Sequence, residues 1–520
     1  MAKGLEMVCN PVIDIKNVQG DIWPGLPKRF ETFLFFQIRK PEEFRTHLKS
    51  FADSITTAEK VIEMRKVICQ EQDDADMKGR IRQLKPLPGR NIAFSSTGLE
   101  ALGKFTFDEE VVKKDRNLYK EFRKNQLRGG LYQKGMYDDL VNEGWDDPTE
   151  IRDEYKPVGA KKKRSIDGVI LVTSSLEDDL KAEVCLVKEH FGYAPNDGTV
   201  NEGATIDIVL TREGKTRPMK GKEHFGFQDN LSQPQIQGLD APTNKETDKK
   251  TNKEPKAVLP GLIFLGNEGD KMGQPEWARD GSFLVFRDLQ QLVPEFDKFL
   301  EDNAHQVHAT TLSPPTKEKL AAHLMGRWKN GTPVDLSPHS PSDEEIDKNN
   351  NFDYEPINVH KCPFAAHTRK MRPRGDLNDD HAVIIRRGIS YGDEVTPEEW
   401  KARKSDDTKE RGLLFVCYQS DIRSGFNFLT TRWASNHHFP DRKAHLLGGH
   451  GPGIDAIVGQ KLSHHPPRSI CLPDGKVPTE THLSLDRWVI PRGGEYFFTP
   501  SIAALRGYLA SPPAKPASKL

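Results

Sequence analysis

The chain has 520 residues, with 76 Lys and Arg against 77 Asp and Glu, and 35% of its residues are hydrophobic. A chain of this length exceeds one small core, so we expect two domains or one large double domain. The balanced charge offers no basic excess for nucleic acid or an anionic membrane surface, and no apolar run approaches the length of a membrane span.

The first part of the chain alternates apolar runs with amphipathic segments. The run TFLFFQI is short, apolar and bounded by turn residues, which is typical of a buried strand. It is followed by Phe44, Leu48 and Phe51 at helical spacing, with acidic residues in the first turn. Similar patterns predict strands at 32–38, 90–94, 168–173 and 204–211, and helices at 41–51 and 175–189.

The later part repeats this order of strand and helix. Residues 280–300 contain an apolar strand followed by a helix with Leu289, Leu292, Phe296 and Leu300 on one face. Further strands are predicted at 413–418 and 487–498, and a closing helix at 500–509. The repeated pattern predicts two α+β units, each a sheet covered by helices on one side.

The unit boundaries follow from these elements and from polar inserts. We expect an N-terminal unit at 1–220 and a C-terminal unit at 221–510, with mobile polar inserts near 241–257 and 337–351 and an extended tail at 511–520. The N-terminus lacks an apolar h-region, so we expect no secretory signal. The six cysteines form no CxxC pair and are expected to be reduced thiols.

Two stretches carry candidate chemistry. Within Lys361–Gly392, His367 follows two alanines, and Arg386 ends an apolar run 19 residues later. We interpret His367 as the ligand of a buried metal cofactor and Arg386 as a cation on its other face. In HFGFQDNLSQP, Asp229 lies between Gly226 and Pro234, where an aspartate more often caps a turn.

Together, HFGFQDNLSQP, CPFAAHTRK and IIRRGISYG resemble the dye-decolourising peroxidases, a family of haem enzymes. NVQGDIWPGLPKR, DGSFLVFRDLQQLVPEF, RGLLFVCYQS, GIDAIVGQ and VIPRGGEYFFTPSI resemble its fungal, larger-chain branch. The family signature GxxDG appears as Gly226 to Asn230, with Asn230 replacing the last glycine. Asparagine tolerates positive φ, so we expect the turn to be kept, although the side chain could narrow access for peroxide.

The resemblance implies an α+β fold of two ferredoxin-like domains with antiparallel sheets and peripheral helices, and one haem b per chain held mainly by the second domain. It implies that His367 is the proximal iron ligand, that Asp229 is the distal acid and base, and that Arg386 is the distal arginine. Arg387 falls at a position that varies in the family.

Four further residues are implied at the haem. Arg369, two residues after the ligand, would bind a propionate, since its guanidinium matches a carboxylate. Asp455 would accept the other N–H of His367 and so raise the basicity of the imidazole. Leu413 and Phe415 would line the distal side.

The expected activity is that of a haem peroxidase, which reduces hydrogen peroxide and oxidises phenols and anthraquinone-type dyes in one-electron steps. Asp229 would move the peroxide proton, and Arg386 would stabilise the charge on the departing oxygen. Because an aspartate has an intrinsic pKa of about 4, activity should persist or peak at acidic pH. Tyr391 is a candidate surface radical site for bulky dyes, with Trp433 and Trp488 as weaker candidates.

Two other hypotheses remain open. The chain could be a haem-binding or haem-handling protein with little turnover, which would need neither Asp229 nor Arg386. It could also be a non-haem metalloprotein, using a region rich in histidine that lacks zinc-site spacing. The histidines of that region are His437, His438, His445, His450, His464 and His465.

The last three residues are Ser518, Lys519 and Leu520. A terminal SKL is read by the peroxisomal import receptor, so we expect a peroxisomal protein, with a cytoplasmic one as the alternative. Peroxisomal oxidases would supply its peroxide. The natural electron donor and the oligomeric state stay open.

Overall fold

The computed structural model describes most of the chain. The described residues are 13–78, 81, 83–104, 127, 130–158, 165–194, 202–219, 221–240, 257–272, 274–307, 316–342, 352–358, 361–377, 381–460, 466–472 and 482–513. The predicted insert at 241–257 lies outside them except for its last residue, and the terminal SKL lies wholly outside. In the described part, no helix is long and apolar enough to cross a membrane.

The N-terminal half forms four antiparallel strands with helices between them. The strands run in the order β4-β1-β3-β2, in which the fourth strand lies beside the first, as in ferredoxin-like folds. The predicted helix at 41–51 is confirmed as α1, and Pro41 stands at its start. The elements are β1 (Phe30–Ile38), α1 (Pro41–Phe51), α2 (Ala58–Met77), β2 (Gly89–Phe94), α3 (Ser96–Ala101), α6 (Gly130–Lys134), β3 (Gly168–Ser174), α7 (Glu177–His190) and β4 (Ile206–Lys215).

The C-terminal half repeats the same strand order, as β11-β5-β8-β6, with β7 also paired to β8. The predicted helix face in 280–300 was wrong at Leu289, which lies on β5, because the strand continues to Gln291 before the helix begins at Val293. The elements are β5 (Ser282–Gln291), α8 (Val293–Asn303), α9 (Lys317–Met325), α10 (His367–Met371), β6 (Ile385–Arg386), β7 (Ile389–Tyr391), α11 (Pro397–Ala402), β8 (Gly412–Gln419), β9 (Ser469–Cys471), β10 (His482–Ser484), β11 (Val489–Thr499) and α12 (Ile502–Ala504).

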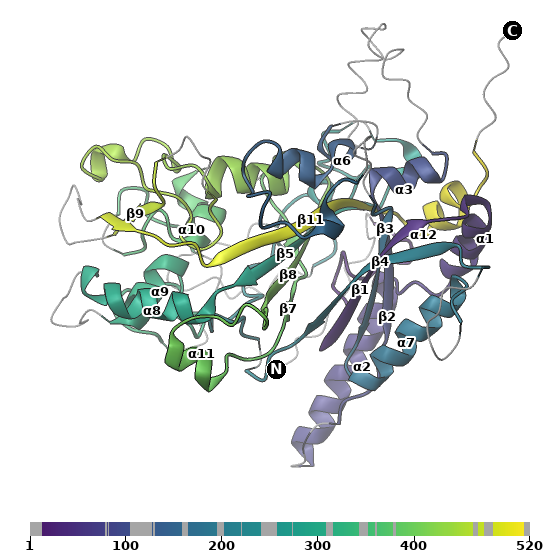
Figure 1. The fold of residues 1–520 in the computed structure, drawn as a ribbon, viewed down its shortest axis with the longest axis horizontal. Coiled ribbons are helices and arrows are strands. Elements are labelled where there is room, and N and C mark those ends of the chain that lie inside the picture. Colours follow the sequence, from purple (N-terminus) through teal and green to yellow (C-terminus); the bar gives the residue numbers. More distant parts are fainter. Residues whose placement is uncertain are drawn as a thin grey trace, which may run out of the picture.

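The two halves share one nine-stranded sheet. They are joined where β11 pairs with β2, at Phe498 and Phe94. At the other edge, β4 lies against β7, and Gly214 leaves the space that Ile389 fills. Figure 1 shows the N-terminal strands and helices on the right and α8 to α11 on the left. The predicted pair of ferredoxin-like units is therefore confirmed, but their sheets are continuous.

Both faces of this sheet are buried, which explains why the strands read as continuous apolar runs. Along β1, Phe33 and Phe35 belong to one apolar cluster, and Leu34 and Phe36 belong to another. The second cluster includes residues of α1 and α7, so those helices cover one face. A third cluster packs α8 and α9 against the C-terminal half, next to α10 and the candidate site.

Candidate active site

His367 is the first residue of α10, and its ring is fixed by a buried carboxylate. His367 Nδ1 lies 2.8 Å from Asp455 Oδ2. The other oxygen of Asp455 accepts hydrogen bonds from the backbone N–H groups of Ile457 and Val458, both at 2.9 Å. Since Nδ1 is used by Asp455, Nε2 is the ring nitrogen that can coordinate iron. The side chain of His367 remains 26% exposed.

The environment of Asp455 favours its ionised form. Burial alone would raise the pKa of this fully buried carboxyl, but His367 and the two backbone N–H groups hold the pKa below its usual value. The carboxylate is therefore charged when it accepts the imidazole N–H. A charged acceptor at this position increases the basicity of Nε2.

The short helix α10 is anchored one turn after His367. Lys370 is fully buried, and its Nζ donates hydrogen bonds to the carbonyl oxygens of Asn436 at 2.7 Å, Phe439 at 2.8 Å and Gly453. Because these carbonyls belong to the segment that leads into Asp455, Lys370 ties the helix of the histidine to the loop of its partner.

Asp229 and Arg386, which come from the other two motifs, form an ion pair. Arg386 Nη1 donates to Asp229 Oδ1 at 3.0 Å, and Arg386 Nη2 donates to the carbonyl of Ser232 at 3.2 Å. Asn230 has a φ of 60°, so the expected turn with positive φ is confirmed for asparagine. The N–H of Asn230 donates to Asp229 Oδ1 at 2.6 Å, and Asp229 Oδ2 has no hydrogen-bond partner among the described residues.

The turn that presents Asp229 is built around Glu223. Its carboxylate accepts from the N–H groups of Phe225 at 2.9 Å and Phe227 at 2.8 Å, and from Gln291 Nε2 at 2.6 Å. Burial raises the pKa of Glu223, against the effect of these hydrogen bonds. Glu223 therefore connects the turn of residues 223–229 to strand β5.

Leu413 and Phe415 lie on one face of β8, where they remain partly exposed. Their neighbours Leu414 and Val416 point to the other face and are fully buried. Leu289 of β5 pairs with Leu413 and is also partly exposed. The two predicted lining residues therefore share one face of the sheet. Apolar side chains that stay partly exposed on strands inside a sheet are suited to contact an apolar cofactor ring.

The structure contradicts the expected role of Arg369. Its side chain is fully buried and forms a bidentate pair with Asp376, at 2.7 and 3.0 Å. Its other N–H groups donate to the backbone carbonyls of Cys362, Glu355 and Asn358. With its guanidinium thus committed to the protein, Arg369 cannot bind a haem propionate, although the motif CPFAAHTRK made this assignment reasonable.

Arg327 is a residue that the sequence analysis missed. It follows Gly326, the left-handed end of α9, which packs against Ala366 and Thr368 beside His367. Burial lowers the pKa of Arg327 to about 10, and the charge of Arg386 contributes to this shift. Arg327 is 6% exposed, and its Nη1 donates to the carbonyl of Gly331 at 2.8 Å. Only its separation from both motifs in the sequence concealed it.

The structure also contradicts Tyr391 as a surface radical site. Its side chain is 5% exposed, its ring stacks against the Arg212 guanidinium at 4.6 Å, and its hydroxyl has no hydrogen-bond partner. Trp433 and Trp488 are also buried. Among the described tryptophans and tyrosines, Trp400 of α11 alone is exposed, at 44%.

The histidine-rich region does not gather into a metal site in the described part of the chain. No group of three His, Cys, Asp or Glu side chains there is placed to hold a metal ion. His437 is buried, whereas His438, His445 and His450 are exposed. His464 and His465 lie outside the described residues.

Comparisons with known proteins agree with this geometry. Residues 17–218 match the model of the DyP dimeric alpha+beta barrel domain, and residues 316–447 match that of the Dyp-type peroxidase C-terminal domain. A dye-decolorizing peroxidase of Exidia glandulosa is 35% identical over 96% of this chain and 88% of its own length. The peroxidase AauDyP1 of Auricularia auricula-judae is 33% identical over 96% of this chain and 87% of its own.

Solved structures give the same result. A variant of the dye-decolorizing peroxidase from Pleurotus ostreatus superposes with a TM-score of 0.80 at 32% identity, covering 96% of this chain and 100% of its own. A weaker relative, 25% identical over 52% of this chain and 52% of its own length, is named deferrochelatase in Yersinia pseudotuberculosis.

Proposed function

The chain belongs to the dye-decolorizing peroxidases, a family of haem enzymes, and from this premise we propose that it reduces hydrogen peroxide at one haem b and oxidises aromatic donors. His367 Nε2 would hold the iron, and Arg327 would bind a propionate in place of Arg369. Leu413 and Phe415 would cover the ring on its distal side. The donor set fits the group because it pairs a carboxylate-bound imidazole with apolar side chains and a buried cation.

The bound haem would supply the two oxidising equivalents taken from peroxide, while the protein supplies placement and electrostatics. Asp229 Oδ2 would accept the proton from the inner oxygen of hydrogen peroxide and return it to the outer oxygen. Arg386, held at 3.0 Å from Asp229, would stabilise the negative charge on the departing oxygen. A donor would then restore the resting state in two one-electron steps.

The observation that carries this proposal is the direct pairing of Asp229 with Arg386. The two residues are separated by 156 intervening positions and are brought together by the turn of residues 229–233 and strand β6. A protein that only binds or transfers haem has no use for a paired acid and arginine, which is why turnover is favoured over haem handling.

The test compares the haem-loaded protein with Asp229→Asn, by absorption spectroscopy before and after one equivalent of peroxide. We expect the parent Soret band to shift rapidly, and the variant to react about 10²- to 10⁴-fold more slowly. Asparagine keeps the size of the side chain but cannot take the proton. A normal haem band that ignores peroxide in both proteins would support the haem-handling alternative.

Small phenols are proposed as donors, since a solved dye-decolorizing peroxidase at 32% identity is a complex with 2,6-dimethoxyphenol. Bulky dyes would need an exposed oxidation site, for which Trp400 is the candidate. Peroxisomal import through Ser518, Lys519 and Leu520 also remains a proposal. It predicts that a fluorescent protein followed by residues 511–520 enters peroxisomes and that the same fusion without the last three residues stays cytoplasmic.

A further inference from the structure

The backbone of Arg386 lies at an edge of the sheet. Its strand β6 is the last in the strand order and has β8 on one side. The next N–H, that of Arg387, donates to the carbonyl of Val416 in β8 at 2.7 Å. The N–H and C=O of Arg386 therefore point away from β8, toward the side where no strand follows in that order.

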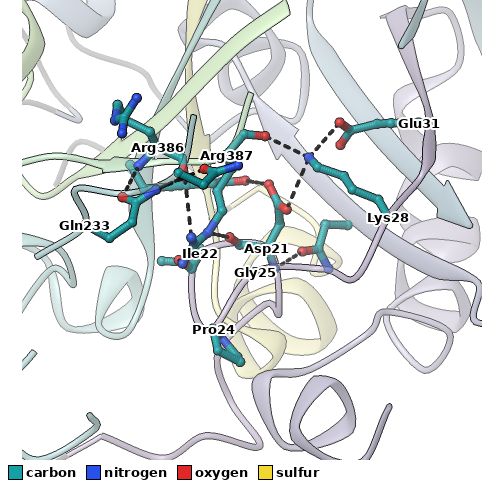
Figure 2. Close-up of polar contacts among 12 residues, drawn as sticks. Asp21, Ile22, Pro24, Gly25, Lys28, Glu31, Gln233, Arg386 and Arg387 are labelled. Atoms are coloured by element: carbon teal, nitrogen blue, oxygen red, sulfur yellow. Dashed lines mark hydrogen bonds and ion pairs between the residues drawn. The ribbon is translucent and has the colours of Figure 1, made fainter. Parts of the chain in front are cut away.

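A side chain takes the place of the next strand. Gln233 Oε1 accepts the N–H of Arg386 at 3.0 Å, and Gln233 Nε2 donates to the C=O of Arg386 at 2.8 Å. Figure 2 shows the amide of Gln233 facing the backbone of Arg386. Gln233 Nε2 is also 3.4 Å from Asn230 Oδ1, the residue that departs from the family signature.

The other side of Arg386 is fixed by the N-terminal half. Arg387 donates to the carbonyl oxygens of Asp21 at 2.9 Å and Ile22 at 3.2 Å, and Lys28 donates to the carbonyl of Arg387 at 2.7 Å. Gly25 has a φ of 97°, a conformation that favours glycine, and a Cβ there would also lie 2.7 Å from Arg387 Nε. Arg387 is thus held by the N-terminal half and by β8, and among the described residues it is Gln233 that links the backbone of Arg386 to the turn that carries Asp229.

We propose that Gln233 is the positioning residue that sets the distal arginine against the distal aspartate, an inference that rests on the proposed peroxidase function. Gln233 belongs to the same turn as Asp229 and Ser232, which both bind the Arg386 guanidinium. The turn therefore contacts both the guanidinium and the backbone of Arg386. A primary amide provides one donor and one acceptor side by side, which is the pattern that the N–H and C=O of one residue require.

The test uses two variants of Gln233 and a matched control. Gln233→Leu removes both hydrogen bonds. Gln233→Glu restores the donor and acceptor pair only when its carboxyl is protonated. The control is Asn267→Leu, because Asn267 is also a buried amide that makes two hydrogen bonds, to the carbonyl of Leu265 at 3.1 Å and to Asp280 Oδ1 at 3.0 Å, in the loop before β5.

The measurements are the rate with peroxide, the fluoride affinity of the haem-loaded protein, and hydrogen exchange at residues 385–387 of the haem-free protein. Fluoride is the probe because it binds ferric haem as an anion without turnover. For Gln233→Leu we expect the rate with peroxide and the affinity for fluoride each to fall about 10- to 100-fold. Hydrogen exchange at the backbone N–H of Arg386 should become faster. For Gln233→Glu, the rate relative to the parent should rise as the pH falls. Asn267→Leu should lower the melting temperature and leave the other readouts unchanged.

The proposal would be overturned if Gln233→Leu had the same fluoride affinity and the same hydrogen exchange as the parent. It would also be overturned if the rate of Gln233→Glu with peroxide were lower than that of the parent by the same factor at every pH. If Gln233→Leu does not fold, the pH dependence of Gln233→Glu decides. If the parent bound haem and fluoride but did not react with peroxide, the peroxidase function would be refuted. Fluoride affinity and hydrogen exchange would still test whether Gln233 positions Arg386.

Discussion

The imidazole Nδ1 of His367 lies 2.8 Å from Asp455 Oδ2, and no part of the Asp455 side chain is exposed. The carboxylate is charged, since its partners hold its pKa below the usual value despite burial. This pair combines residues from two motifs that are 88 positions apart. It sets both the orientation and the basicity of the proposed iron ligand.

Replacing Asp455 with asparagine should keep the hydrogen bond but remove its charge. We expect the haem reduction potential to rise and the rate with peroxide to fall about 10- to 100-fold. Spectroelectrochemical titration of the haem-loaded variant measures the potential. An unchanged potential would mean that Asp455 only orients the ring, and it would limit the role of the charge to folding.

Arg369 and Arg327 should respond differently to replacement by methionine. Arg369→Met removes the bidentate partner of the buried Asp376 side chain and leaves Lys443, at 3.4 Å, as its remaining cation, so we expect a loss of about 3–5 kcal/mol in the free energy of unfolding. Arg327→Met should instead weaken haem binding, because a propionate would lose its cation. Urea unfolding of the haem-free proteins and haem titration separate the two effects. Haem affinity that falls in Arg369→Met but not in Arg327→Met would restore the original assignment.

Tyr391→Phe should leave dye oxidation unchanged. The Tyr391 hydroxyl has no described acceptor for the proton that a tyrosyl radical must release, and burial raises its pKa well above the usual value. The structure-based counterpart is Trp400→Phe, which should slow a large anthraquinone dye without affecting a small phenol. Steady-state rates with both donors give the answer. A dye-specific loss in Tyr391→Phe would revive the relay through the buried ring.

The ion pair of Glu399 with Arg411 predicts a loss of stability in acid. Burial alone would raise the pKa of Glu399, but two 2.8 Å hydrogen bonds from Arg411 and two backbone N–H groups lower it to about 2. Because the folded pKa lies below the usual 4.5, this stabilisation is present above pH 4.5 and is lost as the pH falls toward 2. Its full size is about 3 kcal/mol.

Urea unfolding at pH 7 and pH 3 measures this effect. Glu399→Gln should be less stable than the parent at pH 7, and the difference should shrink at pH 3. The control is Asp302→Asn, whose exposed pair with Lys298 should contribute little at either pH. A difference that is constant between the two pH values would show that the Glu399 carboxylate is not preferentially stabilised in the folded protein.

The sequence by itself determined the local elements and the residues that carry the chemistry. The apolar runs of β1 and β3 and the helical spacing of Phe44, Leu48 and Phe51 have few alternatives, because period and burial are local properties of the chain. Asn230 could be assigned positive φ for the same reason. The motifs around His367, Asp229 and Arg386 named the family, and the expected partner of the histidine, Asp455, is the one observed.

Only the tertiary structure decided how those side chains are used. The position of Arg369 after His367 suggested that it binds a propionate. In the structure its guanidinium forms hydrogen bonds to Asp376 and to three backbone carbonyls instead. Tyr391 lies close to Arg386 in sequence but turns into the buried face of the sheet. Hydrogen-bond partners and exposure depend on which distant segments meet, and so the tertiary structure, rather than the motifs, decided the contacts of Gln233 and the exposure of Trp400.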